Sequence, residues 1–344
     1  MRPEIFFVPR TALLYQTLYN NGTMVLDNLF AHKKVLDEYL TAFLTEKKTA
    51  LGGINSWGKE SITRLLPFIT AGKSVRGCLA LFSYNMFAKS NQIKIALPLA
   101  AGLEFIHAGA LIHDDIMDQD DMRRHLKSMH RQFDQFSTDK HFGEGMAINI
   151  GDLCFFLAFE QFSKITSPNS SYLISLASQE FATVTVAQQF DVASSYLPYK
   201  STEEEIISLY RTKTARYTFS LPLIMGGLLA NTDVSTLKIL ESLGQSIGIL
   251  FQIRDDELSV MGDIIKTGKP IGSDEKNKKQ TLIRLFLQEE NSADYPKSTA
   301  FILIQKIMKH YEDLAKQTLQ KLPIENIYKQ TLKELIEFCG MREE

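Results

Sequence analysis

The segment Asp114-Asp115-Ile116-Met117-Asp118 places three carboxylates close together, and the pair Arg123-Arg124 follows it. A second acidic pair, Asp255-Asp256, lies far downstream. Residues four apart share one face of a helix, so the carboxylates of Asp114 and Asp118 would repel each other there. Burying two such acid clusters is costly unless cations occupy the space between them. Magnesium prefers oxygen ligands of this kind and completes its shell with water and phosphate oxygens, so the segment predicts a site for a diphosphate ester carried on metal ions.

The chain on either side of the acids argues against an ordinary solvated helix face, which is the usual role of an acid run. Gly102–His113 is an apolar helical tract that runs directly into Asp114. The pair Arg123-Arg124 follows after a predicted loop, and guanidinium groups suit phosphate oxygens. This context favours a functional site over a solvated surface.

Composition limits the classes of protein to which the chain can belong. Its 344 residues are 44% hydrophobic and 23% charged, which is ordinary for a soluble globular protein. A formal net charge of −2 argues against nucleic acid as a partner, because nucleic-acid binding requires a basic stripe. The three cysteines are scattered and odd in number, so they indicate neither a disulfide framework nor a zinc site. We expect a reducing, cytoplasmic compartment.

No membrane span is predicted. The N-terminus, Met1-Arg2-Pro3-Glu4, lacks the apolar core of a signal peptide. The most apolar tracts, Ala96–His113 and Tyr217–Ala230, are interrupted by Glu104 and Pro222, so both are predicted to be core helices.

Helical periodicity dominates the chain. Leu36, Leu40 and Phe43-Leu44 recur at helical spacing, whereas strand-like alternation is nearly absent. Clusters of Gly, Pro and Asn divide the chain into about ten long helices joined by short loops. Ser201-Thr202-Glu203-Glu204 is typical of a capping box that opens a helix. The sequence therefore predicts an all-α protein.

One domain spanning residues 1–344 is the simplest account of this pattern, because no low-complexity linker interrupts it. The chemically suggestive residues lie between the two ends. We therefore expect the segment 1–60 and the segment from 290 onward to be peripheral.

Five motifs lie in order between about residues 70 and 285. The motifs are Gly72-Lys73-Ser74-Val75-Arg76, Asp114 to Asp118 with Arg123-Arg124, Ala187-Gln188-Gln189-Phe190-Asp191, Lys213-Thr214, and Phe251-Gln252-Ile253-Arg254-Asp255-Asp256 with the tail Gly268 to Asp274. Together they resemble the polyprenyl synthetase family of trans-isoprenyl diphosphate synthases, specifically its short-chain members. The resemblance implies the isoprenoid synthase fold, a single large bundle of helices around a central cavity.

The resemblance also implies a reaction, the head-to-tail condensation of an allylic diphosphate with isopentenyl diphosphate through an allylic carbocation. Two or three magnesium ions would be held by Asp114, Asp118 and Asp255. The allylic diphosphate would be bound by Arg123, Lys213 and Lys269. The isopentenyl diphosphate would be bound by Lys73, Arg76, His107 and Arg124. The implied catalytic residues are Lys213, Thr214 and Gln252, and the last two would direct oxygen dipoles at the carbocation.

The chain departs from the family pattern at three positions. Ser74 stands where the family usually has arginine, which removes one phosphate donor, and Ala187 replaces a glycine. Ser259 replaces the final aspartate of the second motif, which leaves the second metal site with one oxyanion fewer.

Asp120 would permit a longer acid spacing, but the step from Asp114 to Arg123 fits the shorter one, so Asp118 is assigned as the third acid.

Product length should follow from how far the growing tail slides between helices. One helix turn rises roughly 5.4 Å, close to one isoprene unit. The residues one turn before Asp114 are Gly109 and Ala110, which would not block the tail. Ile106 is next along that wall, and Phe155 or Phe156 would form a floor. We predict a twenty-carbon product, geranylgeranyl diphosphate.

Two alternative functions fit some of the same residues. Ser74 and Ser259 favour a catalytically weak or inactive regulatory subunit that modulates an active partner. A class I terpene cyclase also uses acid-rich metal motifs, but the basic residues Lys73 and Arg76 are needed only if a second diphosphate binds. The resemblance further implies a homodimer.

Overall fold

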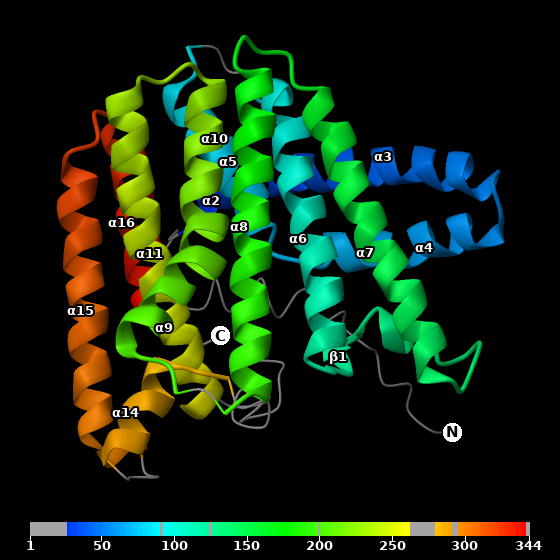
Figure 1. Cartoon of the computed structure of the whole chain (residues 1–344). Helices are drawn as coiled ribbons and strands as arrows, with labels where there is room; N and C mark the ends of the chain where they lie inside the picture. The colour runs from blue at the N-terminus through cyan, green and yellow to red at the C-terminus, as the bar shows by residue number, and fades with distance from the viewer. Residues whose placement is uncertain are drawn as a thin grey trace, which may run out of the picture.

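The chain folds as a bundle of long helices (Figure 1). The computed structural model describes residues 26–89, 92–123, 126–198, 200–261, 279–290 and 295–341. In these residues, β structure is confined to the short antiparallel pair β1 (Met122–Arg123) and β2 (Leu126–Lys127). The predicted all-α class is confirmed.

The helices follow one another with short connections. The first half of the chain contains α2 (Asp27–Phe30), α3 (Lys33–Gly52), α4 (Ser56–Thr70), α5 (Val75–Phe87), η1 (Ile93–Ala96), α6 (Leu97–Met117), η2 (His130–Phe133) and α7 (Lys140–Ser163). The second half contains α8 (Ser170–Tyr196), α9 (Glu203–Leu209), η3 (Tyr210–Ser220), α10 (Leu221–Leu229), α11 (Val234–Met261), α14 (Leu282–Glu290), η4 (Tyr295–Lys297), α15 (Thr299–Gln320) and α16 (Asn326–Met341). Figure 1 shows α3 and α4 lying across the direction of the other long helices.

Helix α6 runs through the first of two hydrophobic cores. Most of its side chains between Leu97 and Ile112 are buried, and α6 contacts α3, α5 and α7. The approach to α7 depends on a glycine. A Cβ atom at Gly109 would lie 2.7 Å from Cε1 of Phe155 and 2.8 Å from the carbonyl oxygen of Gly151. This packing fixes the position of the acid motif at the end of α6.

The second core joins α11 and η3 to α15 and α16. Ile304 of α15 and Ile336 of α16 are fully buried, as is Leu36 of α3 in the first core. The prediction that the two ends of the chain are peripheral is therefore wrong for their described parts. The position of the catalytic motifs along a chain does not determine which helices contribute apolar faces to the core.

A capping box opens α9, one residue later than the sequence suggests. The backbone N–H of Glu205 donates to the Thr202 hydroxyl over 3.3 Å, and the N–H of Thr202 donates to the Glu205 carboxylate over 2.8 Å. Helix α9 then continues into η3, which has the wider turns of a π-helix. Such segments are rare and often occur at functional sites. Here η3 contains Lys213 and Thr214.

Two helical stretches of the described chain, Ile93–Met117 and Lys140–Ser163, are long and apolar enough to cross a membrane. A third candidate arises if α4 and α5, which are bent by 62°, count as one span. Inside the bundle, 72% of the apolar window of the first stretch is buried, but only 39% of that of the second. Packing in the core accounts for the apolar composition of the first stretch, whereas the second stretch leaves apolar surface exposed.

Candidate active site

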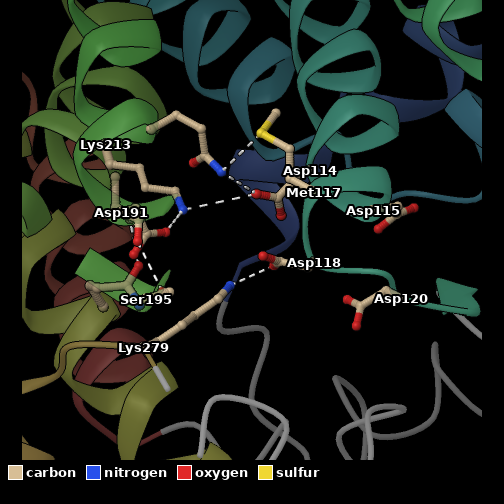
Figure 2. Close-up of polar contacts among 12 residues, drawn as sticks. Asp114, Asp115, Met117, Asp118, Asp120, Asp191, Ser195, Lys213 and Lys279 are labelled. Atoms are coloured by element: carbon tan, nitrogen blue, oxygen red, sulfur yellow. Dashed lines mark hydrogen bonds and ion pairs between the residues drawn. The ribbon is translucent and has the colours of Figure 1, made fainter. Parts of the chain in front are cut away.

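The first acidic motif lies where α6 ends. Helix α6 ends at Met117, and Asp118 is its C-terminal cap. Asp115 is fully buried, while the side chains of Asp114 and Asp118 keep 22% and 13% exposure. Figure 2 shows Asp114 and Asp118 directed toward the same group of side chains, with Asp115 and Asp120 on the other side. The two predicted metal ligands of this motif are thus brought together.

Arg123, predicted to bind a diphosphate, is held by the buried acid of the motif. Its Nε donates to Oδ1 of Asp115 over 2.6 Å, and its guanidinium lies 3.7 Å from Asp114 and 3.4 Å from Asp120. Burial raises the pKa of Asp115 to about 6, although Arg123 opposes this shift. The ion pair with Asp115 fixes Arg123 beside the acid motif.

The wall opposite the end of α6 is formed by α8 and η3. Gln188 of α8 donates its amide to Oδ1 of Asp114 over 3.0 Å. Lys213 of η3 places its Nζ 3.9 Å from the same oxygen and forms an ion pair with Asp191 (Figure 2). The motif around Gln188 and Asp191 was visible in the sequence, but the role of these two side chains in orienting Lys213 and Asp114 was not.

A second lysine at this site was not predicted. Lys279, which precedes α14, places its Nζ 2.6 Å from Oδ2 of Asp118 (Figure 2). Burial alone would lower the pKa of Lys279, but the charges of Asp114, Asp118 and Asp191 raise it above its ordinary value. The sequence shows several lysines just before α14, and their spacing does not indicate which of them reaches the acids.

The second acidic motif divides into one exposed and one buried acid. Asp255, a predicted metal ligand, is exposed on α11, whereas Asp256 is buried. Asp256 accepts hydrogen bonds from Tyr210 and from Nε2 of Gln252, the latter over 2.8 Å. The hydroxyl of Thr214 donates to Oε1 of Gln252 over 2.7 Å. The predicted pair Thr214 and Gln252 is thus joined and anchored to Asp256.

The basic motif lies at the start of α5. Lys73 is exposed, and Ser74 adopts the left-handed conformation with φ of 51° while its hydroxyl is buried. A carboxylate from another helix stabilises this turn, because Glu104 of α6 accepts a hydrogen bond from the N–H of Gly77 over 2.7 Å. Helix N-termini carry unsatisfied N–H groups, so Glu104 acts as a cap supplied from a distance.

Tyr217 connects two residues that were predicted to bind isopentenyl diphosphate. The guanidinium of Arg76 lies 4.2 Å from the centre of the Tyr217 ring, and the His107 ring lies 6.1 Å from it. Arg76 also donates to the Thr218 hydroxyl over 2.6 Å. Among the residues that the structure describes, none forms a hydrogen bond with the buried Tyr217 hydroxyl, and burial raises its pKa to about 12. Sequence spacing gave no signal for this contact.

Two of the predicted substrate-binding residues, Arg124 and Lys269, lie outside the described residues, as does the tail Gly268 to Asp274. Their predicted roles stay predictions.

Comparisons with known proteins identify the family of the chain. The model of the polyprenyl synthetase family matches residues 59–322. The chain belongs to this family. A short chain isoprenyl diphosphate synthase of Methanocaldococcus jannaschii is 34% identical over 242 residues, covering 70% of this chain and 70% of that protein. A geranylgeranyl diphosphate synthase of Saccharolobus solfataricus is 30% identical over 304 residues, covering 80% of this chain and 88% of that protein.

A solved structure matches most of the synthase. That structure is of a geranylgeranyl pyrophosphate synthase from Corynebacterium glutamicum, complexed with isoprenyl diphosphate and magnesium. The TM-score is 0.82 at 25% identity, and the match covers 92% of this chain and 99% of that one. The synthase is therefore a prenyltransferase of the short-chain isoprenyl diphosphate synthase type, with the fold that the resemblance implied. Its family condenses an allylic diphosphate with isopentenyl diphosphate and uses divalent metal ions.

The residues that were predicted to set product length have different surroundings in the synthase. Gly109 lies where α6 meets α7, so its lack of a side chain is needed for helix packing whatever its effect on the product. Ala110 is half-buried and Ile106 is buried. Phe155 packs edge-on against His113, with ring centres 5.4 Å apart, whereas Phe156 is 73% exposed. Of the two predicted floor residues, Phe155 is the one directed into the protein.

The acids at the end of α6 suit a magnesium ion by their chemistry. Within the described parts of the synthase, no three His, Cys, Asp or Glu side chains are grouped closely enough to hold a metal by themselves. Magnesium at phosphate sites is commonly held by one or two carboxylates, with water and phosphate oxygens as the other ligands. Asp114 and Asp118 provide two carboxylates, and the ammonium groups of Lys213 and Lys279 lie against them as stand-in cations.

Proposed function

We propose that the synthase makes geranylgeranyl diphosphate by repeated head-to-tail addition of isopentenyl diphosphate to an allylic diphosphate. The observation that carries this reaction is the pair Asp114 and Asp118 facing Lys213 and Lys279 (Figure 2). Carboxylates can hold metal ions, and ammonium groups beside them can hold the oxygens of the same diphosphate.

Two or three magnesium ions at Asp114, Asp118 and Asp255 would supply Lewis-acid stabilisation of the departing diphosphate. Lys213 is placed to bind that group, since its Nζ lies within 3.9 Å of Asp114. Arg123 and Lys269 would bind it as well. Fixed cations aimed at a charge that develops in the transition state lower the barrier without reorganisation at the moment of reaction.

The allylic carbocation would form beside Thr214 and Gln252. Their mutual hydrogen bond and the bond from Gln252 to Asp256 hold both side chains in place. Oxygen dipoles that are already oriented stabilise a developing cation, and apolar surroundings keep water from reacting with it.

Isopentenyl diphosphate would be held by Lys73, Arg76, His107 and Arg124. The contacts of Arg76 and His107 with the Tyr217 ring support placing two of these residues in one site. The double bond of isopentenyl diphosphate then attacks the carbocation, and the proton that is lost passes to the released pyrophosphate. No side-chain nucleophile is needed.

The twenty-carbon length is supported by the small side chain at Ala110, one helix turn before Asp114. Ala110 is half-buried, so its replacement by a large side chain would project into the space beside α6. Ile106, a further turn away, would border the end of the tail.

Product sizing tests the proposal. The purified chain is incubated with magnesium, labelled isopentenyl diphosphate and dimethylallyl diphosphate, and the dephosphorylated products are separated by chain length. A twenty-carbon alcohol is the expected result, whereas a fifteen-carbon limit would overturn the proposed length. Activity that requires a partner protein would indicate a regulatory subunit, and a cyclised hydrocarbon from one allylic substrate would indicate a terpene cyclase.

We further propose that the synthase is a cytoplasmic homodimer with no membrane span. The support is α7, whose exposed apolar side chains include Ile148, Phe156 and Phe159. A second copy packed on this helix would remove these side chains from water, and the burial of apolar surface favours association. Such packing would also account for the apolar window of α7 without a membrane.

A further inference from the structure

The contact between Lys279 and Asp118 places an ammonium group on a carboxylate that the proposed metal ion needs. Nζ of Lys279 lies 2.6 Å from Oδ2 of Asp118, and the two side chains keep only 18% and 13% exposure. Figure 2 shows Lys279 reaching this acid from the side of the site opposite α6. Because the pair is largely shielded from solvent, its mutual attraction is screened less than that of a surface ion pair.

A divalent ion and Lys279 would compete for this carboxylate. Magnesium binds carboxylate oxygens at about 2.1 Å, so an ion on Asp118 would lie very close to the ammonium group and be repelled by it. The neighbouring acid Asp191 already forms an ion pair with Lys213. The oxygens of a bound diphosphate would offer a displaced Lys279 a new anionic partner.

We propose that Lys279 competes with the divalent metal ion for Asp118, so that the metal binds tightly only when a diphosphate is also present. The proposal rests on the metal role proposed above for Asp118. The ammonium group balances the acid charge in the absence of metal, and it moves away from Asp118 when the metal diphosphate binds. Coupling of this kind is reciprocal, so the metal increases the affinity for diphosphate by the same factor.

Titration calorimetry on the full chain tests this competition with magnesium chloride alone, and then with inorganic pyrophosphate present. Lys279→Gln removes the charge but keeps a polar side chain, and it should bind magnesium alone about tenfold more tightly than the wild type, within the usual range of coupling factors. The increase in magnesium affinity caused by pyrophosphate should shrink accordingly. Lys279→Arg keeps the positive charge and should behave like the wild type.

Thermal unfolding provides a second readout that does not depend on activity. In EDTA, Lys279→Gln should melt below the wild type, because the carboxylates of Asp114 and Asp118 lose a counter-ion. Added magnesium alone should raise its melting temperature more than that of the wild type. Lys279→Met is a second neutral variant that should show the same pattern, and circular dichroism establishes that each variant is folded.

Two further variants distinguish a failure of the proposed competition from a failure of the metal role of Asp118. Lys309→Gln removes a lysine that pairs with Asp313 over 2.9 Å on the surface of α15, and it should leave magnesium affinity unchanged. Asp118→Asn should weaken magnesium binding. If Asp118→Asn weakens binding but the neutral Lys279 variants bind magnesium no more tightly than the wild type, the competition is overturned and the metal site stands. If Asp118→Asn has no effect on affinity, the metal role of Asp118 itself fails.

Discussion

At the scale of single residues, neighbouring acids in one motif have different partners. Asp115 is fully buried and holds Arg123, while Asp114 and Asp118 face Lys213 and Lys279. Helical periodicity predicted the shared direction of Asp114 and Asp118. It did not predict the pairing of Asp115, because that depends on the return of the chain through β1, which contains Arg123.

Replacing Ala110 by phenylalanine should shorten the product. The new ring would occupy the space one helix turn from Asp114, so we expect mainly a fifteen-carbon product in the sizing assay. Ala110→Val, with a smaller addition, should give a mixture. An unchanged chain length in Ala110→Phe would show that the growing tail does not pass this position.

His130 should make stability depend on pH. Burial, aided by the neighbouring Arg131, lowers the pKa of this buried imidazole below its ordinary value of 6.5. The unfolded chain therefore takes up a proton before the folded chain does, so stability is lost as the pH falls below about 6.5. We expect the free energy of unfolding, measured in urea, to fall between pH 7 and pH 5.5. The fall should be larger for the wild type than for His130→Gln. An equal loss in both proteins would contradict this assignment.

At the scale of elements, two local structures place side chains that are proposed to bind the substrates. The π-helical turns of η3 contain Lys213 and Thr214, and the start of α5 contains Arg76. Ser74 stands at that start with a positive φ of 51°, a conformation that side-chain-bearing residues adopt at a cost. Glu104 offsets part of this cost by accepting the N–H of Gly77.

Glu104→Leu should destabilise the protein and weaken the binding of isopentenyl diphosphate. It leaves the buried N–H of Gly77 without its acceptor, which costs roughly 1–3 kcal/mol in the free energy of unfolding. We expect a raised KM for isopentenyl diphosphate and a smaller change in the KM for the allylic substrate. The reason is that the start of α5 carries a residue proposed to bind isopentenyl diphosphate and none proposed to bind the allylic diphosphate. Glu104→Gln keeps an acceptor oxygen and should recover much of both losses. Equal changes in the two KM values would argue against a local role in positioning α5.

At the scale of the whole molecule, the two cores use helices from both ends of the chain. Helices α15 and α16 pack on α11, which contains the second acidic motif, and α3 packs on α6, which contains the first. The ends therefore support the site although they carry none of its motifs. Helix α7 is covered on one side, where Gly151 and Cys154 face the core, and leaves Phe156 exposed.

Phe156→Glu should convert the proposed dimer into a monomer. A charged side chain at the centre of an apolar contact would have to be buried without a partner, which is strongly unfavourable. Ile302→Glu is the matched control, because Ile302 is also exposed but lies on α15. Analytical ultracentrifugation should show a reduced mass for Phe156→Glu and an unchanged mass for Ile302→Glu. A monomeric wild type would refute the proposed assembly.

The sequence by itself determined the helical class, the order of the motifs and the common face of Asp114 and Asp118. These features depend on short-range spacing, since helical periodicity and turn residues act over a few positions. The tertiary structure decided that Lys279 reaches Asp118 across 161 residues and that Arg76 reaches Thr218 across 142. It also decided that Asp256 serves as an anchor and that Glu104 caps α5. Such contacts follow from how apolar faces pack against one another, and no local pattern in the chain records that packing.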